Sequence, residues 1–144
     1  MGQFTFRLQT LMRVRQSRRD RHRVRLAEAV EVEQGVARRL EELALQRHAL
    51  QVECREAAGP GILDLERLVE RRQHERLVTE EIKQLEIQQA ESARRSRRQS
   101  AVLVAAQREL RSLERLEQHQ QAKYELQHKR QETRVLDEMA SMVR

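Results

Sequence analysis

The sequence predicts an all-α protein: a long antiparallel two-helix coiled-coil hairpin with an overhanging C-terminal helix. Among its 144 residues are two Phe, one Tyr and no Trp, and 36% are charged, which leaves too few bulky side chains for a globular core. Apolar residues recur at heptad spacing along much of the chain. The single proline stands between two glycines, at Gly59-Pro60-Gly61. We therefore expect one hairpin over residues 1–144, with arm one at about 4–58, the turn at 59–61 and arm two at about 64–142.

The turn has a physical cause in the residues around Pro60. Glycine can enter the left-handed conformation that closes a helix, and proline cannot continue one, so Ala57-Ala58-Gly59-Pro60 is a stop signal. After it, Asp64 can accept hydrogen bonds from the free N–H groups of a new helix. Glu66 adds negative charge at the positive end of that helix dipole.

Arm one opens on an apolar segment that runs into a basic one. The opening segment contains Phe4, Phe6, Leu8, Leu11, Met12 and Val14, of which Leu8, Leu11 and Met12 are spaced to share one helical face. Residues 1–25 then carry eight Arg against Asp20 alone, a balance of +7. From Leu26 the heptad returns, with Ala29, Val36, Leu43, Leu50 and Ala57 at one position and Leu26, Leu40 and Cys54 at most of its partner position.

Arm two carries two apolar stretches separated by a polar gap. The stretches are Leu65, Leu68, Val78, Ile82 and Leu85, then Leu103, Ala106, Leu110, Leu113 and Leu116, with Gln89, Ser92, Ser96 and Gln99 on the seam between them. An antiparallel register in which paired residue numbers sum to about 121 sets apolar against apolar. It pairs Leu43 with Val78, Leu40 with Ile82, Val36 with Leu85, Leu11 with Leu110 and Leu8 with Leu113, and it puts Phe4 near Leu116.

The same register brings two basic runs to one level of the hairpin. We call these runs, Arg18 to Arg25 and Arg94 to Arg98, the basic belt. Like charges at this density weaken a hairpin unless an anionic surface neutralises them. We expect the belt to attract an acidic protein surface; the alternative is a solvated charged face.

The two arms differ in length, so the second must overhang the first. Roughly 54 residues before the turn span about 80 Å as a helix, and roughly 80 after it span about 120 Å. Residues from about 121 onward have no partner in the chain, yet Leu136, Met139, Ala140 and Val143 recur at helical spacing. We expect another protein to cover this stripe; the alternative is a frayed tail without function.

The sequence offers no constellation for catalysis or metal binding. The five His never stand at i, i+4 spacing, Cys54 is alone, and there is no phosphate-binding glycine loop. We therefore expect no enzyme, no metal, no cofactor and no small-molecule substrate. A basic helical nucleic-acid binder is an alternative, against which stands the lack of base-stacking side chains in residues 13–25. The lone cysteine and the absence of an apolar run of about 20 residues predict a cytoplasmic protein.

Two segments, one near each end of the chain, carry a recognisable pattern. The first is the opening Phe4-Thr5-Phe6-Arg7-Leu8-Gln9-Thr10-Leu11-Met12-Arg13-Val14-Arg15. The second is the closing pattern Leu113-Glu114-Arg115-Leu116, Tyr124, Arg130, Glu132 and Leu136-Asp137-Glu138-Met139-Ala140. Both resemble the corresponding segments of the FliJ family of flagellar type III export proteins. The resemblance implies a nonenzymatic stalk similar to the central stalk subunit of rotary ATPases.

That resemblance also implies partners and a location. The stalk would insert into the ring of the flagellar export ATPase and contact the export gate and export chaperones, at the cytoplasmic face of the inner membrane. An injectisome stalk protein and a coiled-coil scaffold without an ATPase partner remain alternatives. The expected partner-binding residues are Phe4, Phe6, Leu8, Leu11, Arg18, Arg21, Arg25, Arg94, Arg95, Arg97, Arg98, Tyr124, Leu136, Met139 and Val143.

Overall fold

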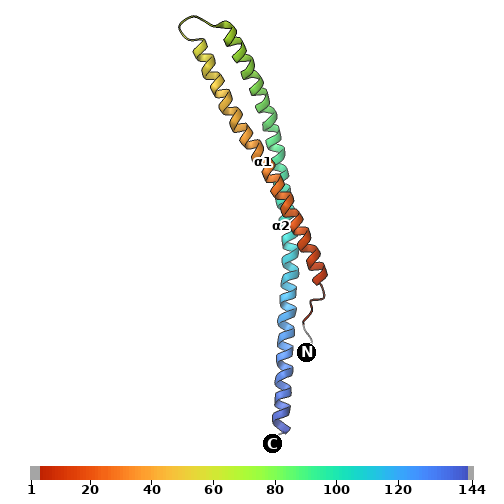
Figure 1. Ribbon diagram of the computed structural model, residues 1–144. Coiled ribbons are helices and arrows are strands. Elements are labelled where there is room, and N and C mark those ends of the chain that lie inside the picture. The colour runs from red at the N-terminus through yellow and green to blue at the C-terminus, as the bar shows by residue number, and fades with distance from the viewer. Residues whose placement is uncertain (1–3, 143–144) are drawn as a thin grey trace. The chain divides into compact units, whose positions relative to one another are not determined.

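The computed structural model describes residues 4–142, and over these residues the protein is all-α, as predicted. Helix α1 runs from Gln9 to Ala57 and helix α2 from Leu65 to Met142, and the described residues contain no strand (Figure 1). At 49 and 78 residues, the two helices differ in length as expected. By contacts, the chain divides into residues 24–101, which include the turn, and a second unit of residues up to 23 with those from 102 onward.

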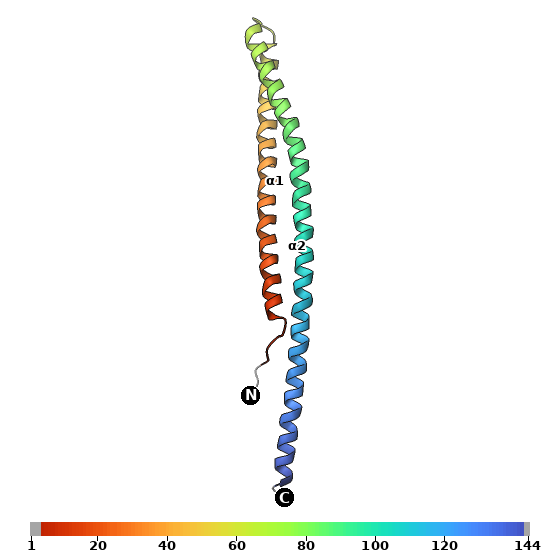
Figure 2. The ribbon, with the colours of Figure 1, turned by 90° about the vertical axis from the view of Figure 1, so that its right-hand side faces the viewer.

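In residues 24–101, α1 and α2 lie side by side on the two sides of the turn (Figures 1 and 2). Their core is one cluster of Leu43, Leu50, Val78 and Ile82, with Leu40 and Leu85 packed against it. The cluster contains both members of two pairs of the expected register, Leu43 with Val78 and Leu40 with Ile82. It also contains Leu85, without its expected partner Val36, and Leu50, for which no apolar partner was expected. Two polar contacts between the helices lie within one residue of that register: Arg39 with Glu81 at 3.0 Å and Gln46 with His74 at 3.1 Å.

The polar gap is also present on the seam of this unit. Ser92 is buried, and its hydroxyl donates a hydrogen bond of 3.0 Å to the carbonyl of Gln89. Ser96 and Gln99 are half-buried. The hydroxyl of Ser92 is thus satisfied within its own helix, so its burial does not leave a polar group without a partner.

The turn ends α1 and starts α2 through backbone and side-chain hydrogen bonds. The N–H of Ala58 donates to Cys54 and that of Gly59 to Glu56, both at 3.1 Å. The positive φ that we expected at Gly59 falls at Gly61, where φ is 152° and a side chain would be strained. Gly59 closes the helix with a tightened i−3 bond, so the chain reverses only after Pro60. The N–H of Arg67 donates to Asp64 Oδ1 at 3.1 Å, which confirms the predicted cap.

In the second unit, the start of α1 and the segment before it pack on α2. Phe6, Ala106 and Leu110 are buried here, whereas Leu11 is 40% exposed. The guanidinium of Arg15 in α1 pairs with the carboxylate of Glu109 in α2. The apolar opening of the chain therefore supplies packing for this unit mainly through Phe6.

The placement of Phe4 near Leu116 is wrong. Residues 4–8 precede α1, and the ring of Phe4 lies against Tyr124, with 5.7 Å between the ring centroids. An extended residue advances about 3.3 Å and a helical one 1.5 Å, so residues 4–6, which precede a turn at residues 7–8, gain roughly 5 Å, or about four positions along α2. The expected register assumes that both paired segments are helical, so it does not apply to residues 4–8.

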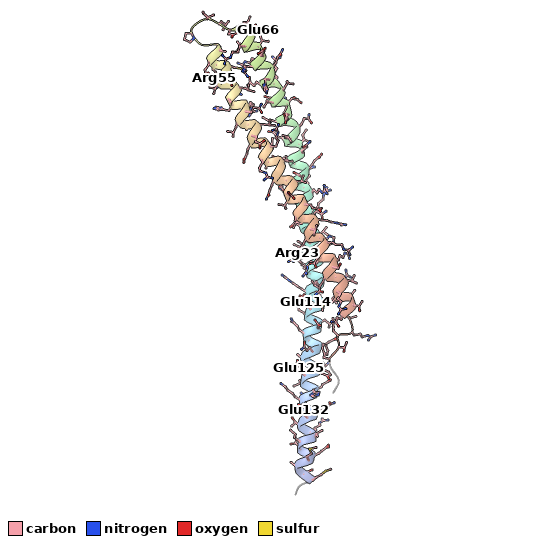
Figure 3. All side chains as sticks on the ribbon, viewed as in Figure 1. Arg23, Arg55, Glu66, Glu114, Glu125 and Glu132 are labelled. Carbon is pink, nitrogen blue, oxygen red and sulfur yellow. The ribbon has the colours of Figure 1, made fainter. Side chains whose placement is uncertain are left out.

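Beyond the level of Tyr124 and His128, α2 continues with no other described segment of its unit beside it (Figures 1 and 2). All residues from 129 to 142 are exposed. We call residues 129–142 the overhang. Figure 3 shows Glu132 projecting from this part of α2.

Gly35 provides a test of the balance between helix propensity and packing in α1. A Cβ built at Gly35 meets no atom within 4 Å, so Gly35→Ala should raise the free energy of unfolding by about 1 kcal/mol through helix propensity alone. Thermal unfolding followed by circular dichroism measures the change. Gly61→Ala is the control and should lower the melting temperature, because φ there is 152°. A drop in stability with Gly35→Ala would contradict the packing at this position.

Candidate functional site

The overhang carries an apolar stripe that the protein itself leaves uncovered. Val135, Leu136, Met139 and Met142 are 50%, 65%, 60% and 85% exposed. Met139 follows Val135 by four residues and Leu136 by three, and Met142 follows Met139 by three, so the four side chains share one side of α2. An exposed apolar stripe of this kind is the sort of surface that suits a protein partner.

Side chains on this part of α2 form an open groove. It is lined by His128, Gln131, Glu132, Val135, Leu136 and Met139. Leu136 and Met139 were expected on this stripe, whereas Val135 and Met142 were not. Both could have been found by the spacing, since Met139 lies four residues after Val135 and three before Met142. Val143, the last residue of the expected stripe, lies outside the described residues.

Aromatic side chains stand at the end of the groove nearest to α1. The rings of Phe4 and Tyr124 are 5.7 Å apart and tilted by 46°, and those of Tyr124 and His128 are 6.2 Å apart. The Nδ1 of His128 lies 3.2 Å from the carboxylate of Glu132. The N-terminal segment therefore reaches α2 at the level where the groove begins.

The other expected N-terminal binding residues differ in their exposure. Phe6 is 4% exposed and Leu8 is half-buried, so both side chains pack within the protein. Leu11 is 40% exposed. Of this group, Leu11 offers a partner the most surface.

The basic side chains are exposed in both units. In residues 24–101 these are Arg25, Arg94, Arg95, Arg97 and Arg98, and in the second unit they are Arg18 and Arg21. Within the part of the chain that the structure describes, none of the seven forms an ion pair. Their charges are therefore open to an anionic partner or to solvent. The belt itself joins residues of both units and stays a prediction.

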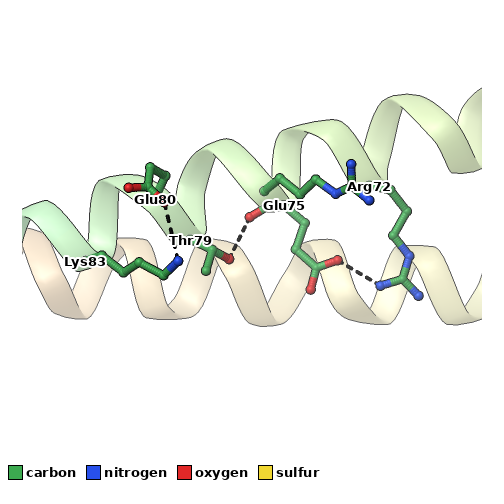
Figure 4. A pocket seen from close by; sticks show the side chains of 6 residues that line it. Arg72, Glu75, Thr79, Glu80 and Lys83 are labelled. Carbon is green, nitrogen blue, oxygen red and sulfur yellow. Dashed lines mark hydrogen bonds and ion pairs between the residues drawn. The ribbon is translucent and has the colours of Figure 1, made fainter.

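A second groove, on α2 near the turn, is polar. It is lined by Arg72, Glu75, Arg76, Thr79, Glu80 and Lys83 (Figure 4). Its charges are paired along the helix, Arg72 with Glu75 at 3.0 Å and Lys83 with Glu80 at 3.4 Å, and Thr79 donates to the carbonyl of Glu75. A hydrogen bond with Gln51 of α1, and then the Arg72 guanidinium, hold the pKa of Glu75 below its ordinary value. Glu75 therefore contributes to the contact between the helices.

A metal ion in a protein requires several side-chain ligands held close together. Among residues 4–142, no group of three or more His, Cys, Asp or Glu side chains is placed to hold a metal ion. A search of the same residues for a helix long and apolar enough to cross a membrane finds none.

These features define a class of protein: two long packed helices whose exposed apolar stripe is suited to a protein partner. A family model described as "Flagellar FliJ protein" matches residues 4–143. The chain therefore belongs to the FliJ family, a nonenzymatic component of flagellar protein export, in agreement with the resemblance in its two terminal segments. The chain matches no curated protein and no solved structure.

The lowered pKa of Glu75 predicts a pH-dependent contribution to stability. Its folded pKa lies below the ordinary value of 4.5, so the contribution is present above that value and disappears as pH falls through the folded pKa. Glu75→Gln should lower the melting temperature slightly at pH 7, and the difference from wild type should vanish at low pH. Glu80→Gln is the control, because Glu80 pairs only along α2. Equal effects of the two changes at pH 7 would contradict the role of Glu75 between the helices.

The contact of Phe4 with Tyr124 predicts how firmly the N-terminal segment is held. An aromatic pair contributes about 0.5–1.5 kcal/mol beyond its buried area, so Phe4→Ala should speed amide exchange in residues 5–8 with a small change in melting temperature. Phe6→Ala should lower stability more, by about 3 kcal/mol, because Phe6 is buried. Exchange rates unchanged by Phe4→Ala would show that this ring does not hold the segment.

Proposed function

We propose that this chain is the stalk of the flagellar type III export apparatus. The overhang of α2 inserts into the ring of the export ATPase, and the rest of the protein links the ring to the export gate and to export chaperones. The stalk performs no chemistry of its own. It couples its partners by binding them at the same time. Those partners hold it at the cytoplasmic face of the inner membrane.

The observation that carries the proposal is the uncovered apolar stripe of the overhang. Leu136 and Met139 are 65% and 60% exposed in the free protein, although each would contribute roughly 1.5–3 kcal/mol if fully buried. A stripe retained at helical spacing beyond the end of its neighbouring helix is suited to insertion into a ring-shaped partner. Family membership supplies the export apparatus as the setting.

The exposed arginines are candidates for a second contact. Arg94, Arg95, Arg97 and Arg98 are exposed within five residues of α2, a charge density that an acidic surface on the gate or a chaperone would neutralise. Rim charges of this kind act mainly on association rate and salt dependence. They would guide partners to the stalk, while the apolar stripe would supply most of the affinity.

Replacing two residues of the stripe tests the docking of the overhang. Leu136→Asp with Met139→Asp should weaken binding to the purified export ATPase at least about tenfold, because two apolar contacts with the partner are lost. A tenfold change corresponds to about 1.4 kcal/mol of binding free energy. Stimulation of ATP hydrolysis and motility should fall with it. The melting temperature of the free protein should hardly change, since both side chains are already exposed.

Leu45→Asp is the matched control, because Leu45 is 72% exposed on α1 and lies far along the chain from the overhang. It should leave ATPase binding unchanged. Full binding by the double variant would refute docking through the overhang. Unfolding of the free double variant would show that the stripe belongs to the protein's own core.

A further inference from the structure

Buried side chains are missing from a long part of each helix. In α1, none of the residues from 9 to 28 is buried, and in α2 the only buried side chain between Ile82 and Ala106 is that of Ser92. The core cluster of residues 24–101 lies on one side of this part of the sequence, and the buried Ala106 and Leu110 of the second unit lie on the other. Two apolar cores separated in this way can open independently, because local opening follows the distribution of buried contacts.

The N-terminal part of the second unit is held to α2 by few contacts. We call residues 4–23 the strap. Phe6 is the one buried side chain of the strap, and Phe4 lies against Tyr124 with 5.7 Å between the ring centroids. Arg15 pairs with Glu109, but both side chains are partly exposed, and such pairs contribute little to stability. The two phenylalanine rings are therefore the main hold of the strap on α2.

The helical part of the strap depends on this hold. Residues 9–23 contain six Arg and one carboxylate, Asp20, which pairs with Arg19 at 2.9 Å. Arg15, Arg19 and Arg23 follow one another at four residues, a spacing at which like charges destabilise a helix. Most helical stability in proteins comes from tertiary packing. We therefore expect this end of α1 to fray once it leaves α2.

The side of α2 that carries Tyr124 continues into the groove of the overhang. Half-buried side chains follow one another there at every third or fourth residue: Leu113, Glu117, Gln120, Tyr124 and His128. The rings of Tyr124 and His128 are 6.2 Å apart, and His128 lines the groove. The overhang spans roughly 20 Å, and residues 106–128 span about 35 Å more. Release of the strap would therefore more than double the length of α2 along which a partner can pack.

We infer that the strap is an autoinhibitory cover: it opens from α2 while residues 24–101 stay paired, and the export ATPase competes with it for the face of α2 between Leu110 and His128. That face already accepts apolar side chains, since Phe4 packs on it. A partner that needs the open state binds with an apparent affinity reduced by the fraction of molecules that are open. This inference rests on the proposed function and adds a regulation of its docking surface.

Weakening the strap tests whether it opens separately. In the full-length protein, Phe4→Ala with Phe6→Ala should speed amide exchange over residues 9–23 at least about tenfold, because both main contacts are lost. Exchange over residues 36–57 should not change. Binding to the purified export ATPase should tighten, since more molecules are open. Val78→Ala is the matched control: it removes a buried side chain from the other unit and should leave the exchange of the strap and the ATPase affinity unchanged.

Holding the strap closed should have the opposite effect on binding. Phe4→Cys with Tyr124→Cys, in a Cys54→Ala background, places two thiols where the rings meet, and a cleavable bis-maleimide can join them. The joined protein should bind the ATPase at least about tenfold more weakly than the same protein after cleavage. Tyr124→Cys alone, carrying the reagent at one end, controls for its bulk and should bind as the cleaved protein does.

The outcomes separate this inference from the proposed function. Equal acceleration of exchange in the strap and in residues 36–57 would show one cooperative unit and refute separate opening. Equal binding before and after cleavage, or weaker binding by Phe4→Ala with Phe6→Ala, would refute competition. Loss of binding by Leu136→Asp with Met139→Asp would in either case keep the stalk. If none of these variants alters binding, α2 does not dock on the ATPase, and the proposed function fails as well.

Discussion

The apolar seam between α1 and α2 is the contact on which the rest of residues 24–101 depends. It is narrow: Leu43, Leu50, Val78 and Ile82 form its buried cluster. Because the chain is so poor in aromatic residues, this short row must set the register of the two helices as well as hold them together. Polar contacts beside the seam then follow the register that the cluster sets.

The difference in helix length leaves the end of α2 without a covering helix. α2 has 78 residues and α1 has 49, so α2 keeps a heptad pattern where α1 can no longer cover it. The overhang continues α2 to Met142 and contains strong helix formers such as Leu136 and Met139. A segment that is helical before it binds loses less conformational entropy on binding, and such preorganisation favours affinity.

The charged residues of α2 fall into groups with different surroundings. Carboxylates near the seam hold facing arginines, as in Arg39 with Glu81, while the arginines of 94–98 remain exposed. Exposed ion pairs contribute little to stability, so their main effect is on which surfaces can approach one another.

The sequence by itself determined the two helices, the turn, the cap at Asp64 and the pairing of Leu43 with Val78, because these follow from spacing and from local backbone chemistry. It also predicted the groove in part, through Leu136 and Met139. Only the tertiary structure decided that Phe4 reaches Tyr124. The nonhelical run before α1 has no periodicity from which its reach could be computed, and its path is set by contacts between residues far apart in the chain.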